Sequence, residues 1–329
     1  METLYRTKRN IKRNDVSADS VPVTAIGELN VDLLLTGLNA FPQLGREVLA
    51  TDFEMVLGSA SAIFASGMAR LGHPINFYSK VGDDDFGRFC CAALEKIGIP
   101  TSHIAASKSS RTGVTVALST TSDRALATFL GAIAELAYED LPGNALDGSF
   151  HLHLTSYFLQ HRLRPSFVQL FRDARQRAMT TSFDPNSDPS ESWSAEIWDV
   201  IQETDILFVN EVEALSLSRQ TTVQSALNHL AEKVPCVVIK LGAKGAMGSV
   251  DKEIVSVPPF PISPVDTTGA GDSFAAGFVH AHLLGKELRD CLITGSACGA
   301  LSALKPGGTA GQPTQAELAA FIAQSGDTK

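Results

Sequence analysis

The sequence predicts an α/β fold in which parallel strands are joined by helices and a small second sheet lies outside the main one. From Val21 onward, short β-rich runs alternate with segments whose apolar residues recur at helical spacing, as in sheets built with crossover helices. Two stretches, residues 33–56 and 113–130, contain consecutive β-type runs instead. Because strands joined without a helix cannot be parallel neighbours, we expect these stretches to form a separate small sheet that acts as a lid.

Local patterns place the individual elements. The first strand is expected at 21–26, and the apolar positions from Ile63 to Leu71 mark the first helix. A second helix follows from Phe86 to Ile97, with Asp83 or Asp84 as its cap and Gly98 as its end. Further strands, each separated by enough chain for a helix, are expected at 75–81, 150–155, 180–184, 206–209 and 237–241.

Composition narrows the class of protein. The 329 residues include 27 Lys and Arg against 36 Asp and Glu, a net charge of −9, which excludes a general nucleic-acid binder. Apolar residues make up 44% and charged residues 19%, as in a folded domain with a large core. Residues 1–20 are basic and lack apolar periodicity, so we expect a flexible basic tail, followed by one domain over 21–329.

Several absences bear on location. No window approaches the roughly 18 consecutive apolar residues of a membrane span, and the first residues lack the apolar core of a signal peptide. The five cysteines show no CxxC spacing, which suits free thiols in a reducing compartment. These observations predict a cytoplasmic protein that acts without a membrane.

The strongest chemical signal is the segment Asp266-Thr267-Thr268-Gly269-Ala270-Gly271-Asp272-Ser273-Phe274, which precedes a helical run. Two glycines before a helix let backbone N–H groups converge on one point, where the helix dipole also favours an anion. An aspartate at the edge of such a phosphate cradle would repel the ligand. Asp272 therefore either serves as a general base for a hydroxyl that attacks phosphorus, or only caps the helix.

This segment reads D-T-x-G-A-G-D over residues 266–272 and resembles the ribokinase-like carbohydrate kinases, the PfkB family. The resemblance extends over residues 22–315 and implies a ribokinase-like three-layer α/β/α sandwich with a small β-sheet lid, formed by about 33–56 and 113–130. It implies transfer of the γ-phosphoryl group of ATP to a hydroxyl. Gly269, Ala270 and Gly271 would form the cradle, with Gly271 also touching ATP, and Asp272 would be the base.

On the substrate side, Gly27-Glu28-Leu29-Asn30-Val31-Asp32 resembles the family pattern G-x-x-x-x-D, whose aspartate accepts hydrogen bonds from substrate hydroxyls. The resemblance places Asp32, Asn30, Gly58 and Ser59 in the substrate site. Two family amides are missing, because Ala62 replaces the asparagine of G-G-x-x-x-N and Ile133 replaces that of G-A-N. A pocket that has lost such hydrogen bonds binds hydroxyls worse, so we expect an atypical substrate.

On the nucleotide side, Asn210-Glu211-Val212-Glu213 is similar to the family motif N-x-x-E, which organises Mg²⁺ through water. Asn210 and Glu213, three residues apart at a helix start, suit a hydrated cation, although a helix cap would have the same pattern. Lys240-Leu241-Gly242-Ala243-Lys244-Gly245 resembles the loop that receives the nucleotide. The resemblance therefore assigns Asn210, Lys240, Gly242, Lys244 and Gly245 to ATP.

The loop Pro306-Gly307-Gly308-Thr309-Ala310-Gly311 is similar to the family loop that closes over the adenine side. In ribokinase-like enzymes this loop and the stretch at Asp266 and Thr268 also hold a monovalent cation through carbonyl oxygens, usually K⁺. The cofactors implied are thus ATP and Mg²⁺, with K⁺ as an addition that no side chain demands.

Other residues could supply contacts that the missing amides no longer provide. They lie at the carboxyl ends of two predicted strands, in 153–161 and at Asn186, where ligands gather in open α/β sheets. His151 and His153 share a strand face, but no third metal ligand is evident. Thr112, beside Arg111, occupies the lid position where relatives that bind phosphosugars have an arginine. This favours a non-phosphorylated substrate.

Other enzyme classes lack their motifs here: there is no G-x-x-x-x-G-K-[ST], no G-x-G-x-x-G after the first strand, and no G-x-S-x-G. Two alternatives to a carbohydrate kinase stay open: a nucleoside kinase of the same fold, and a non-catalytic sugar or nucleoside sensor. The expected partner is a small-molecule sugar or nucleoside. The resemblance also implies a homodimer formed through the exposed lid.

Overall fold

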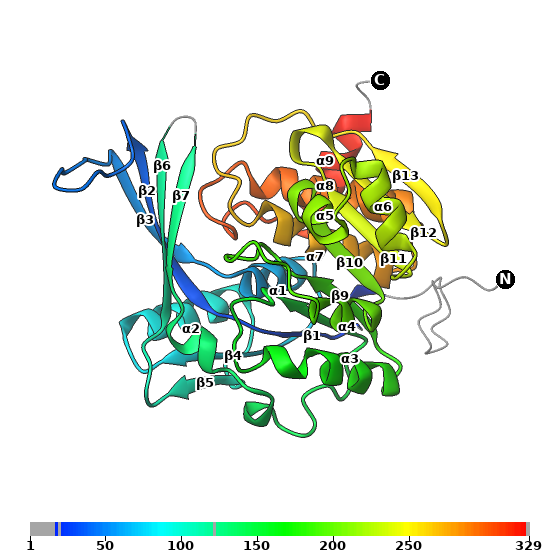
Figure 1. Cartoon of the computed structure of the whole chain (residues 1–329), viewed down its shortest axis with the longest axis horizontal. Coiled ribbons are helices and arrows are strands. Elements are labelled where there is room, and N and C mark those ends of the chain that lie inside the picture. The colour runs from blue at the N-terminus through cyan, green and yellow to red at the C-terminus, as the bar shows by residue number, and fades with distance from the viewer. Residues whose placement is uncertain (1–16, 19–20, 121–122, 327–329) are drawn as a thin grey trace.

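The computed structural model describes residues 17–18, 21–120 and 123–326. The expected basic tail lies almost entirely outside these ranges. Two sheets organise the chain: a nine-stranded sheet in the order β13-β12-β11-β10-β9-β8-β1-β4-β5, and a four-stranded sheet in the order β3-β2-β6-β7. In Figure 1 the smaller sheet stands beside the helix-covered main sheet.

The main sheet is parallel except for a hairpin at one edge. Its parallel strands are β1 (Val23–Ile26), β4 (Ile75–Gly82), β5 (Ile104–Ser107), β8 (His151–Thr155), β9 (Thr180–Asp184), β10 (Ile206–Asn210) and β11 (Cys236–Lys240). The strands β12 (Ala246–Val250) and β13 (Glu253–Val257) form the antiparallel hairpin. The expected strands are thus present within two residues of their predicted limits, whereas β5 and the hairpin were not predicted.

Helices cover both faces of the main sheet and form two apolar cores. One core includes side chains of α1 (Ala60–Arg70), α2 (Asp85–Ile97), α7 (Ala270–Leu283) and α8 (Leu288–Ser302), and α9 (Gln315–Gly326) packs on α8. The other includes α3 (Phe167–Gln176), α4 (Ile197–Gln202), α5 (Glu211–Ser218) and α6 (Val223–Ala231). Within the described ranges, no helix has both the length and the apolar character that a membrane crossing requires.

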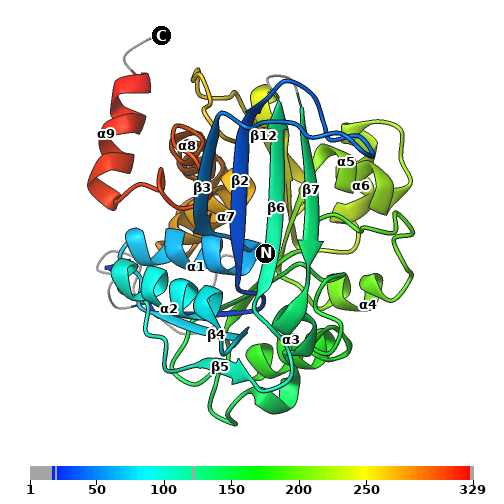
Figure 2. The ribbon, with the colours of Figure 1, turned by 90° about the vertical axis from the view of Figure 1, so that its left-hand side faces the viewer.

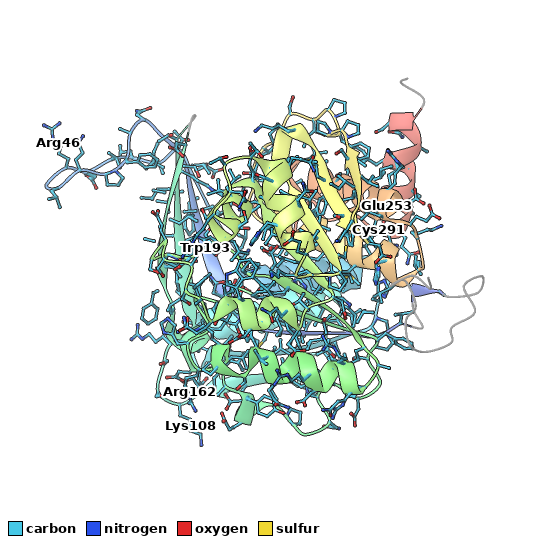
Figure 3. All side chains as sticks on the ribbon, turned by 45° about the vertical axis from the view of Figure 1, so that its right-hand side comes forward. Arg46, Lys108, Arg162, Trp193, Glu253 and Cys291 are labelled. Carbon is cyan, nitrogen blue, oxygen red and sulfur yellow. The ribbon has the colours of Figure 1, made fainter. Side chains whose placement is uncertain are left out.

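The small sheet is built from the two stretches that break the helix–strand alternation. It contains β2 (Asn30–Leu38), β3 (Asp52–Leu57), β6 (Gly113–Thr120) and β7 (Arg124–Phe129). Neighbours in sequence pair antiparallel, while the central pair β2–β6 is parallel. Figure 2 shows this sheet face-on, above α1 and α2. The loop between β2 and β3 carries Arg46 far out from the rest of the molecule (Figure 3).

Candidate active site

A cleft of 1520 Å³ opens where the carboxyl ends of the main strands meet the start of α7. Its walls come from β7 of the small sheet, from the segments after β8 and β9, and from the residues that precede and begin α7. The lining includes the whole stretch from Gly269 to Asp272, together with Asn210, Glu213, Lys240 and Gly242. The structure therefore brings the predicted phosphate cradle and most of the predicted nucleotide residues to one place.

Gly269 gives the cradle its shape. This residue has a φ of 69°, in the left-handed region, and immediately precedes α7. A Cβ at this position would lie 2.6 Å from the Cα of Gly308 and 2.9 Å from Cδ1 of Ile63, so only glycine fits. The first N–H groups of a 14-residue helix point into the cleft here, where they can bind an anion.

Asp272 stands in the first turn of α7 and lines the cleft. Burial, with the nearby charge of Asp184, raises the pKa of its carboxyl group to about 7, although the ammonium of Lys240 opposes the shift. A carboxylate poised near neutral pH can accept a proton from a hydroxyl. The pKa of Asp272 is thus raised toward neutral pH by its surroundings.

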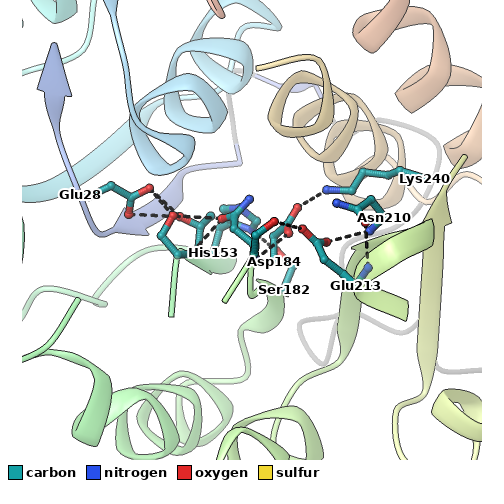
Figure 4. A network of polar contacts seen from close by, with 11 residues as sticks. Glu28, His153, Ser182, Asp184, Asn210, Glu213 and Lys240 are labelled. Atoms are coloured by element: carbon teal, nitrogen blue, oxygen red, sulfur yellow. Dashed lines mark hydrogen bonds and ion pairs between the residues drawn. The ribbon is translucent and has the colours of Figure 1, made fainter. Parts of the chain in front are cut away.

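Lys240, at the end of β11, is the central cation of the cleft. Its Nζ forms an ion pair with Asp184, whose side chain is 1% exposed, and the pair is drawn in Figure 4. A Cβ on Gly271 would lie 3.2 Å from Lys240 Nζ, so the ammonium group borders the cradle. Burial alone would lower the pKa of Lys240, but the carboxylates of Asp184, Glu213 and Asp272 outweigh it and raise the pKa. Sequence reasoning did not assign Asp184.

Asn210 and Glu213 form a capping box at the start of α5. Asn210 Oδ1 accepts from the Glu213 backbone N–H at 2.9 Å, and Glu213 Oε2 accepts from the Asn210 N–H at 2.8 Å. The structure therefore contains the helix cap that the sequence motif could form. Both residues also line the cleft, and burial together with the charge of Asp184 raises the pKa of Glu213 to about 7. The capping box and a role toward a cation are compatible.

A second, apolar cavity of 410 Å³ adjoins the cleft and shares Lys240, Gly242 and Gly271 with it. Gly245, with a φ of 94°, also lines this cavity. A Cβ at this position would lie 2.1 Å from the carbonyl oxygen of Val257, so only glycine fits. Lys244 does not line either space and pairs with Glu211 at 2.8 Å on the surface. Apolar walls come from Ala243, Pro259, Phe260, Ile262, Phe274 and Ala300.

The loop 306–311 contacts the small sheet and the first helix through its glycines. A Cβ on Gly307 would meet Val56 of β3, and one on Gly308 would meet Ile63 of α1. This loop therefore packs behind the cradle and does not line the apolar cavity. The carboxylate of Asp266 holds the two segments together, because Oδ1 accepts from Thr268 and Oδ2 accepts from the Gly307 N–H at 2.9 Å.

Asp32 and its neighbours form a separate group at the base of the small sheet. Asn30 Nδ2 donates to Asp32 Oδ1 at 3.0 Å, and a Cβ on Gly58 would lie 2.1 Å from the same oxygen. Burial raises the pKa of Asp32 to about 6. Ser59 caps α1 and donates to the carbonyl oxygen of Glu28. Asp32 is not among the residues that line the cleft with Asp272.

Glu28 is a site residue that sequence reasoning missed. Its buried carboxylate accepts hydrogen bonds from Ser61, Thr155, Ser156 and Gln160, and it forms one end of the network in Figure 4. These partners come from α1, from the end of β8 and from the segment after it, so Glu28 ties these three parts of the chain together. Its position inside the G-x-x-x-x-D pattern was the available signal.

The two positions that lack the family amides are buried away from the cleft. Ala62 is 0% exposed and Ile133 is 2% exposed, and neither lines the cleft. The expectation of an atypical substrate, which rests on these two positions, therefore stays a prediction. The apolar wall of the cleft comes instead from Leu126, Leu130, Tyr157, Phe158 and Leu159.

Three other predicted positions have structural partners. Thr112 accepts from the Gly82 N–H and donates to Asp84, so it fixes the turn before α2. His151 Nε2 and His153 Nδ1 both contact Ser182 Oγ, at 2.7 and 2.6 Å, and the described residues contain no cluster suited to a metal ion. Asn186 lines the cleft and accepts from the Ser156 N–H at 3.0 Å.

A glycine-rich helix start beside the buried carboxylate of Asp272, at the strand ends of a three-layer α/β fold, is typical of a phosphotransferase. The sequence profile of the pfkB family carbohydrate kinases matches residues 22–315. The chain belongs to this family and is an ATP-dependent sugar kinase.

Two relatives in sequence carry different substrate names. A fructokinase of Vibrio alginolyticus is 30% identical over 284 residues, which are 81% of this chain and 92% of the relative. A 2-dehydro-3-deoxygluconokinase of Bacillus subtilis is 30% identical over 284 residues, 82% of this chain and 87% of the relative. Relatives at equal identity thus leave the choice of sugar open.

Solved structures agree with the fold. An E. coli protein described as ribokinase II, in complex with ATP and Mg²⁺, has a TM-score of 0.81 at 26% identity over 92% of this chain and 99% of that one. A Vibrio cholerae fructokinase double mutant with fructose, ADP and potassium ion has a TM-score of 0.77 at 26% identity over 93% of this chain and 100% of that one. The predicted ribokinase-like sandwich with a second small sheet is confirmed.

Proposed function

We propose that this enzyme transfers the γ-phosphoryl group of ATP to a hydroxyl of a non-phosphorylated sugar or sugar-like small molecule, with Asp272 as the general base. The observation that carries this proposal is the position of Asp272 in the first turn of α7, beside the Gly269 cradle, with a pKa of about 7. Asp272 takes the proton of the acceptor hydroxyl as its oxygen bonds to phosphorus and the bond to the leaving ADP oxygen breaks.

ATP would extend from the apolar cavity, which would hold its base, into the cleft, which would hold its phosphates. The apolar cavity suits a flat base between Ala243, Phe260 and Ala300, while the shared residues Lys240 and Gly271 lie where the phosphates would pass into the cleft. The N–H groups at the start of α7 and the Lys240 ammonium then stabilise the charge on the transferred group. Lys244 lies outside both spaces, and we assign it no contact with ATP.

The residues fit the two implied cations. Glu213 and Asn210 line the cleft and would hold Mg²⁺ through water, and bound Mg²⁺ supplies charge neutralisation of the phosphates. Asp266 and Thr268 would hold K⁺ only through backbone carbonyl oxygens, because both carboxylate oxygens of Asp266 are already hydrogen-bonded. The side chain of Asp266 keeps the 306–311 loop against the cradle.

The small sheet is proposed to act as a lid. Asp32, the proposed acceptor anchor, lies at the base of this sheet with Asn30 and Gly58, whereas the cradle lies across the cleft. Movement of the sheet toward α7 would bring the acceptor held at Asp32 to Asp272 and exclude water. Phosphoryl transfer therefore needs Asp32 on the small sheet as well as the cradle at the start of α7.

The test is acceptor-dependent release of ADP from ATP and Mg²⁺, with and without K⁺, over hexoses, pentoses, keto-deoxy sugar acids, polyols and nucleosides. Asp272→Asn should abolish turnover and leave ATP binding intact, whereas the surface variant Asp83→Asn should keep full activity. Turnover only with nucleosides would replace the sugar assignment. Substantial turnover by Asp272→Asn would remove Asp272 as the base, and acceptor binding without any turnover would favour a sensor.

A further inference from the structure

Arg164 carries a positive charge on the cleft wall that follows β8. It is the first residue of a short 3₁₀ helix, Arg164–Ser166, and it lines the cleft together with Tyr157 and Asp272. It does not line the apolar cavity that the base of ATP would occupy. A fixed positive charge therefore lies in the same cleft as Asp272 but outside the site proposed for the base.

A buried aromatic ring holds this guanidinium in place. Arg164 Cζ lies 5.5 Å from the centroid of the Tyr157 ring, a distance at which the face of an aromatic ring attracts a cation. Tyr157 is 4% exposed, and its ring packs edge-on against the rings of Phe158, Phe167 and Phe183. Because this ring is packed on several sides, the guanidinium is pre-organised and loses little rotamer freedom when it binds a ligand.

The guanidinium of Arg164 forms no ion pair with a carboxylate of the described residues. By contrast, Arg172 on the helix that follows pairs with Glu203 at 2.9 Å. Glu196 lines the same cleft and is influenced by the charge of Arg164, but its pKa is lowered first by its own backbone N–H and then by Ser194. The N–H donors of Arg164 are therefore available to a ligand.

The other arginine and lysine side chains that line the cleft among the described residues have partners near the cradle. Lys240 forms an ion pair with Asp184, and Arg124 donates to Thr268 Oγ1 at 2.9 Å. Both positions lie beside the phosphates of ATP in the proposed function. An anionic group on the acceptor, away from the hydroxyl that reacts, would therefore be bound by Arg164.

The surroundings of Arg164 favour a carboxylate over a phosphate as this anionic group. A guanidinium offers two parallel N–H donors, which match the two oxygens of a carboxylate. Asp188 and Glu196 line the same cleft, and they would repel a doubly charged phosphate more strongly than a singly charged carboxylate. One guanidinium between such neighbours suits a ligand with a single negative charge.

We propose that Arg164 determines the class of acceptor, because its guanidinium binds the carboxylate of a sugar acid whose hydroxyl at the other end of the chain is phosphorylated. This inference rests on the proposed kinase function and narrows its acceptor. The reacting hydroxyl lies at Asp272, which takes its proton as the new O–P bond forms, while the electron pair of the broken bond stays on ADP. Arg164 exchanges no proton and binds only the opposite end of the acceptor.

The test uses pairs of acceptors that differ only at the end that Arg164 would bind. An aldonic acid and the alditol with the same carbon chain share their hydroxyl groups, but the acid ends in a carboxylate and the alditol in a CH₂OH group. The panel contains five- and six-carbon aldonic acids and keto-deoxy acids, each with its neutral counterpart. We expect the best acid to exceed its neutral counterpart in kcat/KM by at least about 10-fold.

Arg164→Ala should remove this preference. Loss of a hydrogen-bonded charge pair should raise the KM of the acid by about 10- to 150-fold, while the KM values of the alditol and of ATP stay within about threefold of wild type. Arg164→Lys should give an intermediate KM, since an ammonium group keeps the charge but lacks the paired donors. The matched control is Arg162→Ala, because Arg162 is exposed, does not line the cleft and lies at the lower surface in Figure 3.

Several results would overturn the inference. Equal kcat/KM for acids and their neutral counterparts throughout the panel would show that no carboxylate is recognised. An equal rise in KM for acid and alditol in Arg164→Ala would show that Arg164 only supports the fold of the wall. A rise in the KM of ATP alone would place Arg164 in the donor site, and a preference for sugar phosphates over sugar acids would replace the carboxylate by a phosphate.

A binding measurement separates this inference from the proposed function. Calorimetric titration of each acid and alditol in the presence of ADP and Mg²⁺ needs no turnover. Wild type should bind the acid more tightly than the alditol, less so in about 0.5 M salt, and Arg164→Ala should bind both equally. If this pattern is found but no acceptor releases ADP from ATP, the kinase proposal fails and the role of Arg164 stands. If neutral sugars turn over and acids show no preference, the kinase proposal stands and the role of Arg164 fails.

Discussion

The α-carbon of Gly58 approaches the carboxylate of Asp32 so closely that a Cβ at position 58 would lie 2.1 Å from Oδ1 and 2.4 Å from Cγ. Gly58 directly follows β3, and Asp32 lies on β2, which pairs with β3 along the small sheet. The absence of a side chain at 58 is therefore what allows Asp32 to adopt its position beside Asn30.

Gly58→Ala should displace the Asp32 carboxylate and weaken acceptor binding. Loss of the hydrogen bonds that Asp32 offers would cost about 1–3 kcal/mol, which corresponds to a rise in acceptor KM of about 5- to 150-fold. The KM of ATP should change little. Gly143→Ala is a suitable control, because a Cβ there meets nothing within 4 Å. An unchanged acceptor KM in Gly58→Ala would place the acceptor away from Asp32.

The pH dependence of turnover should follow Asp272. Since a general base must be ionised and the pKa of Asp272 is about 7, kcat/KM should rise through neutral pH to a plateau. The buried charge of Glu28 contributes to raising this pKa, so Glu28→Gln should lower the pKa and move the rising limb to lower pH. The exposed variant Glu139→Gln should leave the profile unchanged. A limb that moves to higher pH in Glu28→Gln would contradict this electrostatic account.

Buried histidines should make the fold sensitive to acid. His280 is hydrogen-bonded to His73 at 3.0 Å, and burial lowers the pKa of His280 to about 4. Between pH 6.5 and pH 4, His280 is protonated in the unfolded chain but neutral in the folded chain. The folded state therefore loses stability as the pH falls through this range. At pH 5 this loss is about 2 kcal/mol for His280.

His280→Gln keeps a donor for His73 and removes the titration. The difference in unfolding free energy between wild type and this variant, measured in urea, should shift by about 2 kcal/mol in favour of the variant between pH 7.5 and pH 5. The comparison of two chains cancels the opposite contribution of Asp32, Glu213 and Asp272, whose raised pKa values favour the folded state at lower pH. A difference that is independent of pH would refute the prediction.

The outer face of the small sheet should pair with a second copy of the chain. Strand alternation places Asp32 and Thr115 on one face and apolar side chains on the other, where Phe53 is 58% and Phe129 is 56% exposed. We expect a homodimer in solution and a monomer for Phe53→Glu combined with Met55→Glu, by sedimentation at several concentrations. Glu54→Gln, on the opposite face of the same strand, should stay dimeric. The outer apolar face consists of Leu33, Leu35, Phe53, Met55, Val114, Val116, Leu118, Ala125, Ala127 and Phe129.

Sequence patterns predicted six of the nine strands of the main sheet, because each of these is a short apolar run separated from the next by a helix. The range predicted for β9 is the observed one, Thr180–Asp184. The hairpin β12–β13 was missed for a local reason. Its turn contains Asp251 and Lys252, with φ values of 51° and 69°, so it adopts the positive φ angles of a tight hairpin turn without the glycine that normally marks one.

The site was predictable where its residues belong to local sequence motifs. Gly269 to Asp272 form one motif, and the sequence places them together. Asp184 pairs with Lys240, which is 56 residues away in sequence, and Arg124 donates to Thr268, which is 144 residues away. An acidic or basic residue in an ordinary strand context carries no local sign of such a partner, so only the fold reveals it.

The place of β1 in the main sheet affects how the chain can be made. This strand is the first of the sheet to be synthesised, yet its two neighbours are β4 and β8, and β8 ends at Thr155. A growing chain on the ribosome therefore holds one side of β1 unpaired until nearly half the protein has emerged. One edge of β2 likewise stays unpaired until β6 has been synthesised. Such long-range pairing slows folding and exposes strand edges, so we expect this topology to make the nascent chain prone to aggregation before β8 has emerged.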